Sequence, residues 1–311
     1  MINELQKQCS DYDQINLKLE LDYKLAEAQN KNNNIDNRNI NEFMYFDKKQ
    51  LIGYIGICCF GGTDAAFEIT GMVNPRYRRQ GIFSKLHALA TSECKRRNAG
   101  SILLLCDKKS VSGQNFLKTA GAAYKYSEFE MFLRNEPNEI KREEISGFRL
   151  RKATPADVWE VTRQNAIYFG DLHDEENNDI EEERFRLMED EEKPAMSIYL
   201  AEMNELIIGK VHLQIINSIG GIYGLGVLPE NRNKGFGRAI LMKAINMLKE
   251  ANVEEIMLQV ATGNAAALGL YKSCGFQEVS IMDYYEYTMD QYIKSEATSR
   301  AGNSFMEVDK E

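Results

Sequence analysis

Apolar positions along the chain follow two different periods. From Gly235 to Ala251 they return every three or four residues, which predicts an amphipathic helix whose buried face carries Ile240, Leu241, Ala244, Ile245 and Leu248. The segments "SIYLAEM" and "LIIGKVHLQII" are shorter, rich in β-branched and leucine residues, and separated only by Asn204 and Glu205. They therefore predict two antiparallel strands joined by a tight turn.

The same reading extends through the second half of the chain. "FRLRKA" from Phe148 predicts a strand, and "TPADVWEVTRQNA" predicts a helix with Thr154 as N-cap and Pro155 at its first position. "GGIYGLGV", "EIMLQV" and "FQEVSIMDYYEY" predict further strands, and "NAAALGLYKSC" predicts a helix between the last two. This order indicates a mixed α/β (α+β) domain.

The first half of the chain repeats the second at a constant offset of 154 residues, as shown by the pairs Val73–Val227, Pro75–Pro229, Arg78–Arg232 and Gly81–Gly235. Self-similarity at the length of a whole domain indicates tandem copies of one fold. The first copy has no counterpart to the strand at Phe148, and we expect it to open on a helix over "YDQINLKLELDYKLAEA". The predicted organisation is an N-terminal domain over 1–134, a charged linker over 135–146, a second domain over 147–293 and a disordered tail over 294–311.

Composition narrows the possible partners. The net charge of −9 argues against a nucleic-acid partner bound by neutralising phosphates. The polar first segment and the absence of an apolar run of about 20 residues predict neither a signal peptide nor a membrane span. The six cysteines form no C-x-x-C pair and there are three histidines, so neither a disulfide framework nor a metal site is expected, and the predicted location is the cytoplasm.

A basic, glycine-containing loop follows the strand that ends at Val227, and it leads into the amphipathic helix. Its pattern, Arg232-x-x-Gly235-x-Gly237, suits a phosphorylated ligand, because oxygen anions settle on the free N–H groups of a helix start and glycine lets the backbone approach. It matches neither a Walker loop nor the dinucleotide fingerprint. The simpler alternative is a helix that merely begins with glycines.

The loop does not stand alone: it is followed by Asn264 and by "LYKSCGF", Leu270 to Phe276. Together these motifs resemble the GCN5-related N-acetyltransferase (GNAT) family, and the duplication resembles its tandem two-domain branch. The resemblance implies two domains, each a mixed, mostly antiparallel sheet flanked by helices. It also implies an N-acetyltransferase that uses acetyl-CoA as cosubstrate and transfers the acetyl group to a primary amine by direct attack in a ternary complex, in the C-terminal domain.

The resemblance also assigns roles to individual residues. The acetyl-CoA pyrophosphate would lie on the loop made of Arg232, Asn233, Lys234, Gly235, Phe236, Gly237 and Arg238. The pantetheine arm would pair with Leu225, Gly226 and Val227, and the N–H of Val227 would hold the thioester oxygen. Asn264 would bond to the pantetheine, and Tyr271 would protonate the departing thiolate. The alternative for Tyr271 is an aromatic side chain packed in the core.

The first copy departs from this pattern at three positions, since Phe83, Ser110 and Leu117 stand where the second copy has Gly237, Asn264 and Tyr271. We therefore expect the N-terminal domain to be a degenerate copy. Its Glu68 is a minor candidate for a general base. The acid partner for the thiolate is missing from this copy.

The base of the second domain stays open. His212 is either a packed core histidine or a proton acceptor, whereas Tyr223, Tyr284 and Tyr285 are candidates for ordering a water. An amine that arrives deprotonated needs no strong base. Cys274 is expected in the core.

Only the distribution of charged residues along the chain suggests which amine accepts the acetyl group. Carboxylates crowd the segment from Gly170 to Pro194, which is either a solvated acidic face or a field that concentrates a cationic amine such as a polyamine, an aminoglycoside-like compound or a basic peptide end. The partner is thus a small-molecule or peptide amine. The alternative function is an acyl-CoA-binding sensor or pseudoenzyme that regulates a partner.

Overall fold

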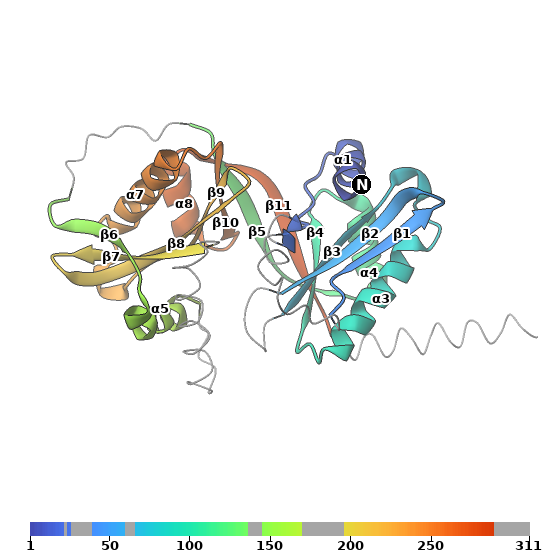
Figure 1. Cartoon of the computed structure of the whole chain (residues 1–311), viewed down its shortest axis with the longest axis horizontal. Helices are drawn as coiled ribbons and strands as arrows, with labels where there is room; N and C mark the ends of the chain where they lie inside the picture. The colour runs from blue at the N-terminus through green and yellow to red at the C-terminus, as the bar shows by residue number, and fades with distance from the viewer. Residues whose placement is uncertain (22–23, 26–38, 60–65, 136–144, 170–195, 289–311) are drawn as a thin grey trace, which may run out of the picture. The chain divides into compact units, whose positions relative to one another are not determined.

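A computed structural model describes residues 1–21, 24–25, 39–59, 66–135, 145–169 and 196–288, which pack into two compact units (Figure 1). The first unit takes Met1–Glu128 together with the stretch that begins at Ser280, and the second takes Phe129–Val279. Most of the predicted linker, the acidic segment and the predicted tail lie outside the described residues. Among the residues described, no helix is both long and apolar enough to cross a membrane.

The second unit is a mixed sheet with helices on both faces, as predicted. In chain order it contains β6 (Phe148–Lys152), a 3-10 turn (Pro155–Asp157), α5 (Val158–Phe169), β7 (Met196–Met203), β8 (Leu206–Ile216), β9 (Ile219–Val227), a second 3-10 turn (Pro229–Asn231), α7 (Phe236–Glu250), β10 (Glu255–Ala261) and α8 (Ala265–Ser273). The strand order is β6-β7-β8-β9-β10, and every pair is antiparallel except β9 with β10.

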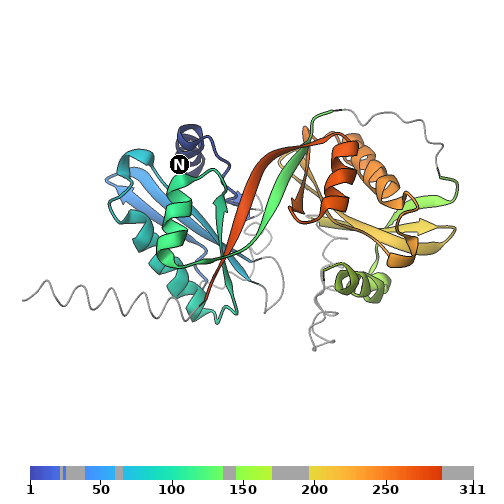
Figure 2. The same ribbon diagram turned by 180° about the vertical axis from the view of Figure 1, so that it is seen from behind.

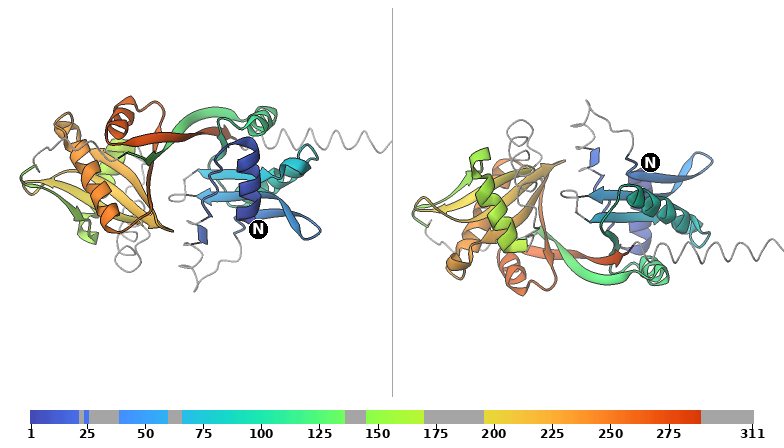
Figure 3. Two further views of the ribbon diagram at one scale, coloured as in Figure 1. Left: turned by 90° about the horizontal axis from the view of Figure 1, so that it is seen from above. Right: turned by 90° about the horizontal axis from the view of Figure 1, so that it is seen from below.

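Each face of this sheet has its own core, because successive side chains of a strand point to opposite faces. The predicted apolar stripe of α7 packs with Cys274 of the α8 end and with Val211 and Leu213 of β8. On the other face, Val158 and Val161 of α5 pack against β7. Figure 3 shows α7 covering the sheet in one view and α5 covering it in the opposite view. Thr154 and Asp157 form the capping box at the start of the α5 segment, which confirms the predicted N-cap.

The first unit repeats this plan without a strand equivalent to β6 among its described residues. Its elements are α1 (Ile2–Asp13), β1 (Glu42–Asp47), β2 (Gln50–Cys59), β3 (Phe67–Val73), a 3-10 turn (Pro75–Tyr77), α3 (Ile82–Arg96), β4 (Ile102–Asp107), α4 (Val111–Ala120) and β5 (Ala123–Leu133). The core under α1 contains Leu5 and Cys9, whereas Leu86 and Ala90 of α3 pack on the opposite face of the sheet.

The helix predicted at the start of the first copy is misplaced. The helix is α1, and it ends where Gln14 takes a left-handed conformation, with φ of 53°. Residues 15–20 are not helical, and Leu17, Leu19 and Leu21 all contribute to the core under α1. Apolar residues at every second position are typical of extended chain, so this segment has the period of a strand and not that of the expected helix.

The last strand of each copy is divided between the two units. β5 belongs to the first unit up to Glu128 and to the second unit from Phe129, where it lies beside β10. β11 (Phe276–Tyr287) begins in the second unit and passes into the first at Ser280. There it pairs antiparallel with β4, from Met282 opposite Asp107 to Tyr287 opposite Ile102 (Figure 2).

The first unit is therefore completed by a strand from the far end of the chain. The repeat predicts β11 as a strand but does not predict this exchange. The domain boundaries 1–134 and 147–293 remain a prediction, because packing alone does not say which segments fold independently.

Candidate active site

The basic loop of the second unit has a defined backbone shape. Asn233 and Gly235 both take left-handed conformations, with φ of 61° and 86°, and the Nε of Arg232 donates to the carbonyl of Val227 at 3.0 Å. Gly235 is the N-cap of α7 and no side chain caps that helix. The first-turn N–H groups of α7 are thus left without a side-chain acceptor, which is the arrangement that binds anions.

The first unit has the same loop shape. Arg79 and Gly81 have φ of 63° and 75°, and the Nε of Arg78 donates to the carbonyl of Val73 at 3.0 Å. Gly81 is the uncapped N-cap of α3. A shape repeated to this detail is a structured loop and not merely a helix that begins with glycines.

The two copies differ at the start of the helix that follows the loop, where the second unit has Gly237 and the first has Phe83. A Cβ added to Gly237 would lie 3.4 Å from Leu270 of α8, which is ordinary van der Waals contact, so the protein itself leaves room for a side chain there. Arg238 donates to the carbonyl and hydroxyl oxygens of Ser273, which ties α7 to α8. The predicted loop and the predicted "LYKSCGF" helix therefore lie together.

β9 and β10 pair over a short stretch and then part. Their parallel register runs only from Ile219 opposite Glu255 to Ile222 opposite Leu258, and β9 then continues to Val227 along β8. The N–H of Leu228 donates to the carbonyl of Ile208 in β8, so this N–H points toward β8. Because successive N–H groups of extended chain point to opposite sides, the N–H of Val227 points away from β8.

β9 also carries a β-bulge beyond the residues that pair with β10. Gly224 and Leu225 together stand opposite Val211, and Gly224 has φ of 54°. The equivalent pair in the first unit, β2 with β3, runs from Gly53 opposite Val73 to Cys59 opposite Phe67 without a shift. Bulges redirect the backbone next to active sites, so the second unit carries a feature that the first lacks.

Asn264 caps a helix, which the sequence analysis did not anticipate. Its Oδ1 accepts from the N–H of Ala267 at 3.1 Å at the start of α8. Ser110 does the same for α4, accepting from Gly113 at 3.2 Å. The exchange of Asn for Ser thus preserves the cap, and only Asn264 retains a side-chain amide whose Nδ2 remains a donor.

Tyr271 has a packed ring and a hydroxyl that is left unbonded by the described residues. Its ring belongs to the core beside Phe276, and the residue is only 8% exposed. Its hydroxyl makes no hydrogen bond with any described residue and is not among the fully enclosed polar atoms. Burial raises the pKa of Tyr271 to about 12, so the phenol stays protonated at neutral pH.

Sequence reasoning missed a buried lysine in β8. Lys210 is fully buried, its Nζ lies 2.8 Å from the Nε2 of His212, and it lies within 6 Å of the ring centroids of Tyr168 and Phe169. The available signal was its place in "GKVHLQI", where Lys210 and His212 share the face opposite the apolar Val211.

Two of the four candidates for the base of the second domain do not lie in the second unit. Tyr284 and Tyr285 belong to the first unit, where they stand opposite Leu105 and Leu104 of β4, and not to the second unit as the repeat predicted. Tyr223 stays on β9 of the second unit, opposite His212. Cys274 is fully buried, which confirms its place in the core.

Comparison with known proteins settles the family. The sequence profile described as the acetyltransferase (GNAT) family matches residues 4–122 and 161–276, together well over half of the chain. The chain belongs to this family. Both copies match, so the tandem arrangement predicted from the repeat is confirmed, as are the α/β fold class and the two GNAT domains.

Curated relatives of this GNAT chain are acetyltransferases. It is 34% identical over 140 residues to the mycothiol acetyltransferase of Thermobispora bispora, covering 42% of this chain and 46% of that protein. It thus spans about half the length of the first curated relatives it matches. A mycothiol acetyltransferase from Saccharomonospora viridis is 26% identical over 254 residues, or 72% of this chain and 81% of that one. The [ribosomal protein bS18]-alanine N-acetyltransferase of Escherichia coli is 35% identical over 77 residues, or 25% and 52%.

Solved structures share the fold of the whole chain. A GCN5-related N-acetyltransferase from Sphaerobacter thermophilus has a TM-score of 0.71 at 16% identity, covering 92% of this chain and 91% of that one. A tandem GNAT protein from the clavulanic acid biosynthesis pathway has a TM-score of 0.60 at 14% identity, covering 79% and 82%.

Proposed function

We propose that the second unit transfers an acetyl group from acetyl-CoA to a primary amine by direct attack, without an acetylated enzyme intermediate. The observation that carries this proposal is Tyr271, whose ring is held in the core while its hydroxyl makes no bond to the described protein. A purely structural tyrosine in this position would gain nothing from a free hydroxyl. The curated relatives named mycothiol acetyltransferase and [ribosomal protein bS18]-alanine N-acetyltransferase support the proposal.

The acetyl-CoA pyrophosphate would lie on the first turn of α7. Arg232 would act mainly by shaping the loop, since its Nε is already bonded to Val227. Lys234, which is exposed, would supply positive charge. Gly237 would let the phosphate oxygens approach the backbone, which explains a glycine that the protein's own packing does not require.

The pantetheine arm would enter where β9 and β10 part and pair with Leu225, Gly226 and Val227 as an added strand. The Nδ2 of Asn264 would donate to a pantetheine carbonyl. The N–H of Val227, which points away from β8, would hold the thioester oxygen as negative charge develops on it.

The reaction then needs one bond to form and one to break. The amine nitrogen attacks the thioester carbon, the C–S bond breaks, and the thiolate takes the proton of the Tyr271 hydroxyl. The nitrogen loses its own proton to solvent or to a base; His212, bonded to Lys210, is the described histidine of this unit. Tyr271 regains a proton from solvent as CoA leaves.

The acceptor is proposed to be a small-molecule or peptide amine, cationic in solution. The acidic segment between Gly170 and Pro194 suggests this, because a field of carboxylates raises the local concentration of cations. If so, acceptor KM should rise with salt concentration while kcat stays constant. A KM that is independent of salt for every active cationic amine would leave this segment as a solvated face.

The test is to screen primary amines for thiol release from acetyl-CoA, using the full chain and two matched variants. Gly237→Glu places a carboxylate at the start of α7, and Phe83→Glu does the same at the start of α3. We expect Gly237→Glu to abolish turnover and acetyl-CoA binding, and Phe83→Glu to leave both intact. Loss of turnover only in Phe83→Glu would place the reaction in the first unit. Acetyl-CoA binding without turnover of any amine would favour the sensor.

A further inference from the structure

Three glycines of β9 lie directly against aromatic rings: Gly221 against Tyr223, Gly224 against His212 and Gly226 against Tyr168. A Cβ added at any of the three would meet ring atoms at 3.2 Å or less, so only glycine lets the rings approach the backbone this closely. We call the rings of Tyr168, His212 and Tyr223 the aromatic floor. It lies on the face of the sheet that α5 covers, because Tyr168 belongs to α5.

The ring of Tyr168 is held in place by several contacts besides the one with Gly226. Its hydroxyl donates to the Oε1 of Gln164 at 2.9 Å, and the fully buried Gln164 donates in turn to Glu160 at 2.7 Å. The Nζ of Lys210, which stands opposite Gly226 in the β8–β9 pair, lies 5.8 Å from the ring centroid. Tyr168 nevertheless stays partly exposed, so a fixed ring is available to a ligand.

Tyr168 lies beside the proposed position of the reacting carbonyl. Its ring covers Gly226, the residue before Val227, whose N–H is proposed to hold the thioester oxygen. Tyr271 lies in the core on the opposite face, under α7, whereas α5 packs on the face of Tyr168 (Figure 3). Because the sulfur would leave toward Tyr271, an amine that approaches from the α5 side does not have to cross the cosubstrate. Its body would then meet the ring of Tyr168.

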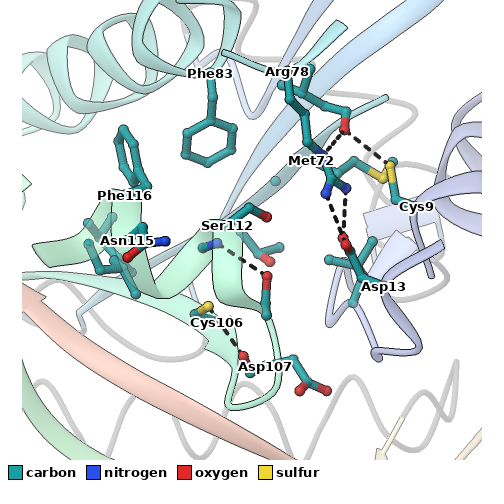
Figure 4. A pocket seen from close by; sticks show the side chains of 18 of the residues that line it. Cys9, Asp13, Met72, Arg78, Phe83, Cys106, Asp107, Ser112, Asn115 and Phe116 are labelled. Atoms are coloured by element: carbon teal, nitrogen blue, oxygen red, sulfur yellow. Dashed lines mark hydrogen bonds and ion pairs between the residues drawn. The ribbon is translucent and has the colours of Figure 1, made fainter. Parts of the chain in front are cut away.

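The first unit has no equivalent of this contact. Met72 stands where the second unit has Gly226, and it packs in the core under α1. Its side chain also lines a cavity of about 730 Å³ in the first unit (Figure 4). An aliphatic side chain thus takes the place that a ring occupies in the second unit. The contact between a ring and the strand backbone therefore accompanies the copy that retains Tyr271.

We propose that Tyr168 selects primary amines in which a short chain joins the amino group to an aromatic ring. The amino group reaches the thioester carbon beside Val227, and the aromatic ring of the amine packs against the exposed part of the Tyr168 ring. A favourable aromatic pair strengthens binding by about 2- to 12-fold beyond the burial of its area. This inference rests on the proposed function and names the class of acceptor for that same site.

The experiment measures thiol release from saturating acetyl-CoA by the full chain with three amines. 2-Phenylethylamine carries the aromatic ring, ethylamine has the amino group without it, and putrescine has a second charge in its place. We expect the lowest KM for 2-phenylethylamine. A lower KM for putrescine or for ethylamine would overturn the proposed class of acceptor.

Variants of α5 test the role of Tyr168. Tyr168→Ala should raise KM for 2-phenylethylamine by about 3- to 12-fold and KM for ethylamine by less than about twofold, with KM for acetyl-CoA unchanged. Tyr168→Phe keeps the ring and loses the bond to Gln164, so it should retain the low KM. Trp159→Ala removes a 66% exposed ring of the same helix and is the matched control, which should change none of these values. Equal changes in KM for all three amines in Tyr168→Ala would overturn the role of Tyr168.

Failure of this inference differs from failure of the proposed function. No thiol release by the unaltered chain with any primary amine would refute the proposed function and this inference with it. Turnover with the same KM for 2-phenylethylamine in the unaltered chain and in Tyr168→Ala would refute this inference alone.

Melting temperatures test the contact itself. Gly226→Ala should lower the melting temperature of the unaltered chain, because the added methyl group collides with the ring of Tyr168. In Tyr168→Ala the same change should cost less, since the ring is gone. Equal losses in both backgrounds would show that the ring does not lie on Gly226 and would overturn the inference.

Discussion

The hydroxyl of Ser127 donates to Asp283 at 2.6 Å, although the two residues are 156 positions apart in the sequence. Asp283 is 5% exposed and also accepts from the Nε2 of Gln114 at 3.0 Å. All three residues belong to the first unit, and Asp283 arrives there on the exchanged half of β11. This buried carboxylate is thus a specific anchor for a strand that a simple tandem repeat would place in the other domain.

Removing this anchor should destabilise the first unit. Asp283→Ala leaves the hydroxyl of Ser127 and the amide of Gln114 without their acceptor, so we expect a loss of about 2–4 kcal/mol in the free energy of unfolding. The measurement is urea unfolding followed by hydrogen exchange at β4. The control is Glu286→Ala, which breaks the exposed ion pair with Lys125 on the same strands and should cost less than about 1 kcal/mol. Equal effects of the two variants would show that Asp283 is no anchor.

Truncation tests the exchange of strands itself. A chain that ends at Val279 retains the part of β11 that belongs to the second unit and loses the part that pairs with β4. Amides of Ile102–Asp107 should then exchange rapidly, because β4 has lost a strand partner. Amides of α7 should stay protected. Unchanged protection of β4 in the truncated chain would contradict the strand exchange.

Replacing Gly237 with alanine should preserve or raise stability but weaken the binding of acetyl-CoA. Its added Cβ meets only ordinary contacts, and alanine is favoured over glycine in a helix by about 1 kcal/mol. Gly237→Ala should therefore raise or preserve the melting temperature and still raise KM for acetyl-CoA at least about tenfold, because the methyl group obstructs the phosphate path. A variant with unchanged KM would show that no ligand approaches this backbone.

The pH dependence of turnover should reflect the raised pKa of Tyr271. An acid works only while protonated, so a pKa of about 12 keeps it active below that pH and loses it as pH rises through 12. With both substrates saturating, kcat should therefore show no alkaline fall near pH 10, the ordinary pKa of a tyrosine. A descending limb near pH 10 that disappears in Tyr271→Phe would contradict the buried environment.

The sequence predicted what depends on local pattern. Helical and strand periods located nearly every element of the second unit, and the offset between Gly81 and Gly235 located the matching loops, because these features depend on near neighbours in the chain. The alternation of Leu17, Leu19 and Leu21 indicates extended chain, which the expected helix over this segment does not take into account. The family resemblance singled out Tyr271 as a candidate residue. Its raised pKa depends on burial, which the spacing of motifs in the sequence does not predict.

Other features have no local signal. β11 has the same strand pattern whichever sheet receives it, so the transfer of Asp283 and Tyr287 to the first unit was not predictable from the repeat. The cap made by Asn264 and the contact of Arg232 with Val227 depend on loop geometry. By contrast, the contact between Lys210 and His212 does have a local signal, because residues two apart on a strand share one face.

The acid that we propose for C–S bond cleavage is the hydroxyl of Tyr271. Tyr271→Phe keeps the ring that packs in the core, and it breaks no hydrogen bond with the described residues, so folding should be unaffected. General acid catalysis contributes about 10²- to 10⁴-fold, and it does so in the transition state and not in the bound ground state.

The decisive measurement is kcat of Tyr271→Phe on an active amine, taken together with its acetyl-CoA dissociation constant and its melting temperature. Leu117→Phe, at the equivalent position of the first unit, is the matched control. We expect kcat to fall about 100-fold or more in Tyr271→Phe, with the dissociation constant and melting temperature preserved, and not to fall in Leu117→Phe. Full kcat in Tyr271→Phe across the pH range would rule out this hydroxyl as the acid and leave Tyr271 as a packing residue.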